Sequence, residues 1–219
     1  MNSSSEKNYD KNLEEYQQRI LSMNDYPEKP LNSRLRSVVD AIPAGSSVLD
    51  VACGTGRVLH AALSKGCKGR GIEIVGSAVE LAQGKGLDVI EGDVDSWPSE
   101  KIVNDLLFDK YDVVVFSKCL MYLKTKNDII DRLQTKHIII FQGNPGSVRN
   151  RFSGESKIMT DWNLQAPYHL KDGTEQVMNG VGSLAKWGAS YGYDCCKTFH
   201  GGLWARSLVV RLSRSQMNS

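Results

Sequence analysis

Apolar residues between positions 45 and 141 gather in short runs, which are separated by stretches with helical spacing. Two of these runs, 113–115 and 138–140, consist only of Val or Ile, which is typical of strands covered on both faces. Strands that alternate with helices predict βαβ units and a doubly wound, mostly parallel sheet. The expected strands are 47–51, 69–74, 87–91, 111–117 and 137–141, and the expected helices are 57–64, 77–85, 100–107 and 127–134.

The first 44 residues lack this alternation and predict a helical cap. Apolar residues recur at helical spacing at Tyr9, Leu13, Tyr16 and Ile20, which predicts an amphipathic helix. A second helix is expected over 31–42, because a Pro-Ala-Gly sequence ends the pattern there. We therefore expect residues 1–44 to form an N-terminal cap and residues 45–219 to form the core of a single domain.

The pattern changes after residue 141. Residues 144–173 are polar and marked by Pro and Gly, which predicts a long irregular segment of the kind that is usually either functional or disordered. A helix is expected over 175–191. Two closing strands, 193–199 and 204–212, are expected to form an antiparallel hairpin through a turn at His200-Gly201-Gly202.

A glycine turn joins the first strand to the first core helix. The sequence there is Asp50-Val51-Ala52-Cys53-Gly54-Thr55-Gly56. Glycine adopts positive φ without strain and lets a ligand approach the backbone closely. Open α/β sheets bind ligands beyond the carboxyl ends of their strands, so we expect a ligand at this turn.

Acidic residues also stand at the ends of the next two strands. Glu73 is placed to accept hydrogen bonds from ribose hydroxyls, and Asp93 with Val94 is placed to contact a nucleobase. A nicotinamide dinucleotide is the competing ligand. Its fingerprint requires a third glycine for close packing of helix on strand, and Leu59 occupies that position here.

The glycine turn resembles motif I of the class I S-adenosylmethionine (SAM) dependent methyltransferases, with Ala52 where glycine is common. The resemblance covers roughly residues 45–212. It implies a three-layer α/β/α fold with a seven-stranded, mostly parallel sheet and an antiparallel last strand, SAM as cofactor, and methyl transfer. The implied cofactor contacts are Asp50, Ala52, Cys53, Gly54, Thr55, Gly56, Glu73, Ile74, Asp93, Val94, Ser117 and Tyr16. Tyr16 would belong to an aromatic lid, or to a packed helix stripe.

Two further resemblances concern subfamilies. The order Asn144, Arg149-Asn150-Arg151, Pro167 and His169-Leu170 resembles the MetW-type methionine-biosynthesis proteins. The segment Tyr26-Pro27-Glu28-Lys29-Pro30-Leu31 is similar to methyltransferases of polysaccharide and natural-product clusters. MetW-type proteins support a partner acyltransferase, which implies an alternative function in which SAM is a regulatory ligand.

The sequence pattern says less about the residues that would contact the methyl acceptor. A hydroxyl acceptor needs a general base, for which His169 and His200 are the candidates, although each also fits a structural or surface role. Lys118 follows the fourth strand beside the expected methyl position, as a catalytic or substrate contact or as a solvated lysine. The candidate substrate contacts are Tyr122, Asn144, Arg149 and Arg151. The two arginines match a carboxylate or phosphate, or form a solvated basic loop.

Composition and short motifs argue against several classes of partner and site. A formal net charge of +2 over 219 residues gives no electrostatic reason to expect nucleic acid or a membrane surface as a partner. Nucleic-acid methylation is further disfavoured because Ser117-Lys118-Cys119-Leu120 replaces an Asn/Asp-Pro-Pro-Tyr/Phe motif. No apolar run approaches the roughly 20 residues of a membrane span, and the cysteines lack zinc-site spacing. We expect a cytoplasmic, metal-free enzyme that methylates a small polar, acidic or sugar-like molecule at oxygen or nitrogen. The oligomeric state stays open.

Overall fold

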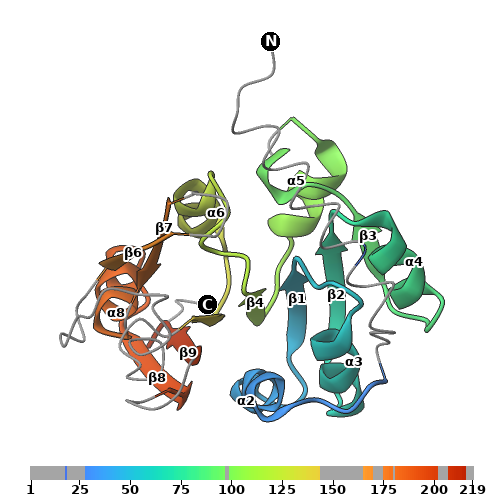
Figure 1. Ribbon diagram of the computed structural model, residues 1–219, viewed down its shortest axis with the longest axis horizontal. Helices are drawn as coiled ribbons and strands as arrows, with labels where there is room; N and C mark the ends of the chain where they lie inside the picture. The colour runs from blue at the N-terminus through green and yellow to red at the C-terminus, as the bar shows by residue number, and fades with distance from the viewer. Residues whose placement is uncertain are drawn as a thin grey trace.

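A seven-stranded sheet runs through the centre of the protein (Figure 1). In spatial order its strands are β3 (Val89–Glu91), β2 (Lys68–Glu73), β1 (Ser47–Val51), β4 (Val113–Ser117), β5 (His137–Gly143), β9 (Ser207–Ser213) and β8 (Cys195–His200). β9 is antiparallel to both of its neighbours, and every other pair is parallel. The computed structural model describes residues 18, 28–96, 99–143, 165–169, 175–179, 181–201 and 207–215. The predicted doubly wound sheet with a reversed last strand is confirmed.

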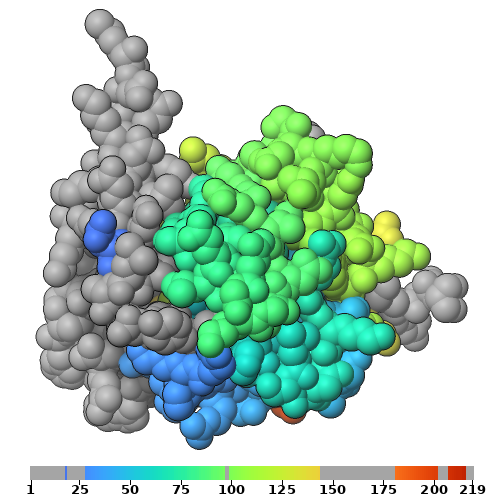
Figure 2. Space-filling view, turned by 90° about the vertical axis from the view of Figure 1, so that its right-hand side faces the viewer, coloured from blue at the N-terminus to red at the C-terminus, as the bar shows by residue number. Residues whose placement is uncertain are grey.

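Helices cover both faces of the sheet, as the three-layer prediction requires. One face carries α2 (Ser33–Ala41), α3 (Arg57–Ser64) and α4 (Gly76–Gln83), and the other carries α5 (Lys101–Leu107), α6 (Lys126–Arg132) and α8 (Val181–Ser190). Successive strand residues point to opposite faces. Val113 and Val115 therefore pack toward α2 and α3, whereas Val114 and Phe116 pack toward α5, α6 and α8. Figure 2 shows the green segment that contains α4 and α5 above the blue segment that contains α2.

Of the cap region, the structure describes residue 18 and the residues from 28 onward. The predicted helix 31–42 is observed as α2, whose N-cap Asn32 accepts hydrogen bonds from the backbone N–H groups of Arg34 (3.1 Å) and Leu35 (3.0 Å). α2 packs its buried residues on the sheet. Of the predicted helix around Tyr16, the structure describes Gln18, which is helical, and Tyr16 itself lies outside the described residues.

The segment after β5 departs from the prediction. An antiparallel hairpin of β6 (Gln165–His169) and β7 (Glu175–Asn179) stands where we expected an irregular segment and then a helix from residue 175. The helix begins only at Val181. The sequence carries the reason, because Asp172-Gly173 between the strands is a hairpin signal and Gly180 separates β7 from α8. His200 likewise closes β8 opposite Val209, instead of standing in the turn.

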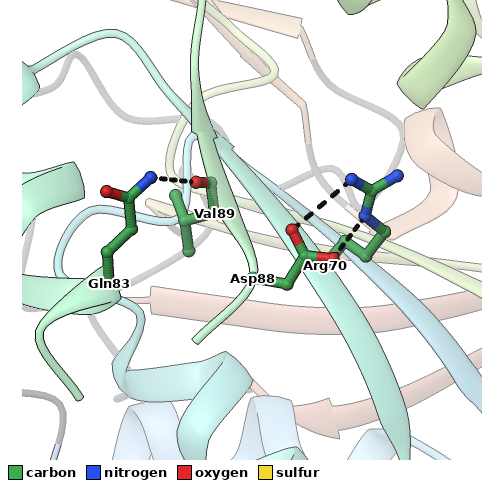
Figure 3. Close-up of polar contacts among 4 residues, drawn as sticks. All are labelled: Arg70, Gln83, Asp88 and Val89. Carbon is green, nitrogen blue, oxygen red and sulfur yellow. Dashed lines mark hydrogen bonds and ion pairs between the residues drawn. The ribbon is translucent and has the colours of Figure 1, made fainter. Parts of the chain in front are cut away.

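The edge strand β3 is short, and its backbone accepts a hydrogen bond from the neighbouring helix α4. Gln83 Nε2 of α4 donates a 2.8 Å hydrogen bond to the Val89 carbonyl (Figure 3). At the start of the strand, Arg70 Nε and Nη2 donate to the two oxygens of Asp88 at 2.7 and 3.4 Å. This ion pair is largely exposed, so its contribution to stability is about 0–1 kcal/mol. The interactions fix the strand that follows α4 and leads into the site.

We expect Gly56→Ala to destabilise the fold more than Gly45→Ala. Both glycines have positive φ, +79° and +74°, where an alanine costs about 1–2 kcal/mol. A Cβ at Gly56 would also overlap Leu87 Cδ1, whereas no described atom lies within 4 Å of one at Gly45. Overpacking of this kind adds about 1–3 kcal/mol. Urea unfolding of the two variants measures the difference, and equal losses would show that the contact with Leu87 relaxes without cost.

Candidate functional site

The glycine turn leads from β1 into α3 with three residues of positive φ. These are Ala52 at +53°, Gly54 at +59° and Gly56 at +79°. The Gly56 N–H donates to the Cys53 carbonyl at 3.0 Å, and the Gly56 carbonyl accepts from the His60 N–H at 2.7 Å, which starts the helix. The left-handed conformation explains the glycines, and it means that Ala52, at the position where the motif usually has glycine, carries backbone strain.

Glu73 closes β2 and holds this turn in place. Its side chain is 2% exposed, and Oε2 accepts a 2.8 Å hydrogen bond from the Gly54 N–H. Oε1 accepts from the N–H groups of Ile74 and Val75, each at 3.0 Å. Burial raises the pKa of Glu73, and the three N–H donors oppose that rise by favouring the charged form. Because a carboxylate offers about four acceptor positions, one remains for a ligand hydroxyl.

Asp50 lies on the same side of the sheet as Glu73 but in a different environment. Its side chain is 1% exposed, and among the described residues neither carboxylate oxygen has a hydrogen-bond partner. Burial, and secondarily the charge of Glu73, raise the pKa of Asp50 to about 8. The Leu59 N–H in the first turn of α3 acts in the opposite direction without completing a hydrogen bond. Asp50 is therefore mostly protonated near neutral pH.

Neighbouring groups around the two acids are neutral. Cys119 donates to the Val51 carbonyl with an Sγ–O distance of 3.3 Å. Burial and the charges of Asp50 and Glu73 raise the pKa of the Cys53 and Cys119 thiols, so both stay protonated. The Thr55 hydroxyl is also buried, at 3% exposure, and has no partner in the part of the chain that the structure describes. The site thus holds several buried polar atoms that lack a partner within the described ranges.

The exit of β3 forms the next wall of the site. Gly92 N–H donates to the Glu73 carbonyl at 2.9 Å, which places Asp93 and the buried Val94 beside β2. One oxygen of Asp93 accepts from the Asp95 N–H at 2.9 Å, and the other makes no such bond in the described part of the chain. Sequence reasoning missed Asp95, whose carboxylate accepts three hydrogen bonds from Lys124 and Thr125 and ties this turn to α6.

The exit of β4 carries the predicted acceptor-side residues. Lys118 has a φ of +65°, and it and Ala52 are the non-glycine residues with positive φ in the described chain. Its N–H donates to the Phe141 carbonyl at 2.7 Å, and its Nζ lies 5.2 Å from the centroid of the Phe141 ring. Ser117 ends β4, and the Tyr122 side chain is 53% exposed. These residues border the same edge as the glycine turn.

The structure brings most of the predicted site residues to one edge and leaves a few apart. The residues of the glycine turn, Glu73, Ile74, Asp93, Val94, Ser117 and Lys118 all follow or end the parallel strands β1 to β4. His200 ends β8, which β5 and β9 separate from β4. His169 ends β6, opposite Glu175 of β7. Asn144, Arg149 and Arg151 lie outside the described residues.

Two other kinds of site, a metal centre and a membrane-spanning helix, are absent from the described residues. Within these ranges, no group of three or more His, Cys, Asp or Glu side chains is arranged to hold a metal ion. Within the same ranges, no helix has the length and apolarity that a bilayer crossing requires.

Asp50 predicts a stability that decreases as pH rises. Its folded pKa of about 8 exceeds the ordinary value of 3.8, so between these values the folded protein keeps a proton that the unfolded chain has lost. The free energy of unfolding therefore falls with rising pH over this window. We expect Asp50→Asn to remove most of that fall, with the largest gain over wild type near pH 8, as urea unfolding at several pH values would measure.

Asp112→Asn is the matched control. The exposed Asp112 accepts hydrogen bonds from the N–H and Oγ of Ser47, each at 2.9 Å, and these bonds lower its pKa. Its contribution is lost only as pH falls through that lowered pKa, so Asp112→Asn should keep the wild-type slope between pH 5 and 8. The same slope in Asp50→Asn as in wild type would contradict the assignment.

Solved structures with this fold include several methyltransferases. A SAM-dependent methyltransferase from Archaeoglobus fulgidus shares 15% identity with a TM-score of 0.61, over 83% of this chain and 92% of that chain. A second structure is the 1,6-didemethyltoxoflavin-N1-methyltransferase of Burkholderia thailandensis, solved with 1,6-didemethyltoxoflavin and S-adenosylhomocysteine. It shares 13% identity with a TM-score of 0.65, and the match covers 99% of this chain and 92% of that chain. An S-adenosylmethionine dependent methyltransferase from Mesorhizobium loti shares 14% identity with a TM-score of 0.56, and the match covers 82% of this chain and 96% of that chain. At these identities the likeness establishes the fold, that of the class I methyltransferases.

The family is given by the sequence. No curated protein matches the chain. The profile described as "Methionine biosynthesis protein MetW" matches residues 32–169, more than half of the 219 residues. The matched range contains the glycine turn, Glu73, Asp93 and Lys118, and it ends at His169. The chain belongs to the MetW family, on a class I SAM-dependent methyltransferase fold.

Proposed function

We propose that the protein binds SAM at the carboxyl ends of β1, β2 and β3 and uses it to methylate a small polar acceptor at oxygen or nitrogen. The observation that carries this proposal is the set of buried polar atoms behind the glycine turn. Asp50 and Thr55 have no hydrogen-bond partner among the residues that the structure describes, although an unsatisfied buried polar group costs about 1–3 kcal/mol. Such a cost is expected where a ligand supplies the missing partner.

The residues present fit the chemistry of SAM. The N–H groups of residues 54–56 and the Asp50 carboxyl suit an amino-acid end that carries both charges, and Glu73 keeps one acceptor position for a ribose hydroxyl. Asp93 and Val94 offer an acceptor and an apolar surface to a nucleobase. When bound, SAM supplies an electrophilic methyl group.

The packing of α3 disfavours a dinucleotide. Leu59 is fully buried against α4 and β3, at the position where the dinucleotide fingerprint needs a glycine. Here the glycine that lets α3 and β2 approach each other closely is on the strand and not on the helix. A Cβ at Gly69 of β2 would lie 2.7 Å from Leu59 Cδ1.

The acceptor would lie beyond β4, where Lys118 and Tyr122 border the edge. Methyl transfer is an in-line displacement, so the protein mainly holds two partners in line and excludes water. The exposed ammonium of Lys118 suits an acceptor with a carboxylate or phosphate. For a hydroxyl acceptor, His169 at the end of β6 is our candidate for the base that takes the proton.

Membership of the MetW family supports a second candidate function. In this alternative the protein binds SAM as a regulatory ligand and supports a partner acyltransferase, without transferring a methyl group. The same glycine turn and the same acids would bind SAM in both cases. The two functions differ at the acceptor side, since only methyl transfer needs an aligned acceptor and, for a hydroxyl, a base.

Ligand-dependent stability tests the cofactor. We expect SAM and S-adenosylhomocysteine (SAH) to raise the melting temperature and NAD to leave it unchanged, because a ligand of the folded state stabilises it by mass action.

Glu73→Gln should weaken SAH binding by about 1.5–3 kcal/mol in calorimetry, since the amide replaces a charged acceptor of three N–H groups. Glu80→Gln, on the exposed face of α4, is the control and should bind as wild type does. A melting shift with NAD and none with SAM would overturn the proposal.

Turnover separates the two functions. We expect SAH to form from SAM with at least one member of a panel of small polar metabolites. If the acceptor atom is a hydroxyl oxygen, His169→Ala should lower that turnover by about 10²–10⁴-fold while SAH affinity stays within a few-fold. The regulatory function predicts no turnover with any acceptor, together with SAM-dependent stimulation of an acyltransferase purified with the protein. Unchanged turnover and pH profile in His169→Ala would remove that histidine from the base role.

A further inference from the structure

Asp95 joins two parts of the candidate site that lie about 30 residues apart in the chain. Its N–H donates to the side chain of Asp93 at 2.9 Å, at the proposed nucleobase end. Its carboxylate accepts three hydrogen bonds at the start of α6. Oδ1 accepts from the N–H (3.0 Å) and Oγ1 (2.7 Å) of Thr125, and Oδ2 accepts from the Lys124 N–H (3.1 Å). Thr125 makes no side-chain cap of its own in the described chain, so Asp95 supplies acceptors there from another element.

Residues 118–125, here called the β4–α6 segment, carry the acceptor-side residues Lys118 and Tyr122. The segment is tied at both ends. The Lys118 N–H donates to the Phe141 carbonyl at 2.7 Å, and Asp95 holds the other end. Between the ties, the Tyr122 N–H donates to a carbonyl inside the segment at 2.8 Å, and the Tyr122 side chain is 53% exposed. The tie at Asp95 is the one that leads to the cofactor side of the site.

Apolar packing supports the same connection. Val94, next to Asp95 in the turn after β3, belongs to one buried cluster with Leu120 and Leu123 of the β4–α6 segment. An outward movement of the segment would expose these two leucines to water, which opposes it. The turn and the segment are therefore joined by a charged acceptor and by a shared apolar cluster.

We infer that Asp95 is a positioning residue that couples the two sides of the site, so that binding of SAM orders the β4–α6 segment and with it Lys118 and Tyr122. The inference rests on the proposed function, because it needs SAM or SAH at the carboxyl ends of β1 to β3. It adds to that function a positive coupling between cofactor and acceptor, which by linkage acts in both directions.

The direction of the coupling follows from rigidity. One oxygen of Asp93 is bonded to the Asp95 N–H, and in our proposal the other accepts from the nucleobase. With a ligand bound there, the turn moves less, and the Asp95 carboxylate stays in place beside the N–H groups that it accepts from. A segment whose anchor moves less opens less often, so its amide hydrogens exchange more slowly with solvent. The acceptor then no longer meets the full entropic cost of ordering the segment.

Hydrogen exchange resolved by residue with NMR measures this coupling without an acceptor. In wild-type protein we expect saturating SAH to slow exchange of the Tyr122, Lys124 and Thr125 amides by about fivefold or more, the lower end of ordinary coupling between sites. Asp95→Ala should still bind SAH within a few-fold, because the backbone N–H of residue 95 keeps its bond to Asp93. In this variant SAH should no longer slow Tyr122, which is the decisive amide because its N–H donates inside the segment and not to Asp95.

Asp95→Asn tests the role of each carboxylate oxygen. It keeps one acceptor oxygen, and the two donors of Thr125 should hold that oxygen in preference to the single donor of Lys124. SAH should therefore slow Thr125 but not Lys124, and it should slow Tyr122 to part of the wild-type extent. This conservative variant decides the matter even if Asp95→Ala fails to fold.

Ser96→Ala is the matched control in the same turn. The Ser96 hydroxyl donates to the Asp93 carbonyl (2.6 Å) and to the carboxylate of Glu100, the N-cap residue of α5 (2.7 Å). Its removal deletes polar contacts of the turn and the link to α5, but it leaves the link from Asp95 to α6. We expect Ser96→Ala to keep the wild-type slowing of the Tyr122 amide by SAH.

The outcomes separate this inference from the proposed function. SAH binding that leaves Tyr122 exchange unchanged in wild type, or that slows it as much in the Asp95 variants as in wild type, would overturn the role of Asp95 and leave SAM binding intact. Equal loss of the slowing in Ser96→Ala would assign the effect to the turn as a whole and would also overturn it. Absence of SAH binding to the wild-type protein would overturn the proposed function, and the coupling with it.

Discussion

The Glu73 carboxylate joins the parts of the candidate site. One oxygen accepts from Gly54 in the turn after β1, and the other accepts from Ile74 and Val75, where the chain turns into α4. These bonds set the position of the turn's amides relative to the end of β2. An isolated charge buried to 2% exposure would be costly, and three charge-assisted hydrogen bonds offset that cost. The glycine turn depends on this clamp as much as on its own φ angles.

Asp50 shows what the same burial does without donors. It lies one strand away from Glu73, on the same face of the sheet, yet no described residue donates a hydrogen bond to either of its oxygens. Burial, and secondarily the charge of Glu73, raise its pKa to about 8, so this acid is mostly protonated near neutral pH. When environments push the pKa values of two neighbouring acids apart, the acids take different roles. Here Glu73 organises the backbone, and Asp50 is the group that can respond to a cation.

Local signals explain which parts of the fold could be predicted. Continuous apolar runs gave β4 and β5, and the glycine turn gave the start of α3, because strand burial and positive φ leave marks in neighbouring residues. The β6–β7 hairpin was missed because Val177, Val181 and Leu184 fit helical spacing across Gly180, although Val177 belongs to β7. The missing partners of Asp50 and the left-handed Lys118 depend on tertiary packing, which no local pattern records.

The strain at the edge bears on the choice between the two candidate functions. A left-handed non-glycine residue costs about 1–3 kcal/mol, and Ala52 and Lys118 both adopt this conformation, at the exits of the adjacent strands β1 and β4. The turn that contains Ala52 serves SAM binding in either function. Lys118 lies on the other side of the edge, where SAM binding at β1 to β3 does not require it. Its backbone bond to Phe141 keeps this conformation and holds an ammonium group beside the proposed acceptor position. In our proposal methyl transfer uses this arrangement, whereas the regulatory alternative assigns it no role.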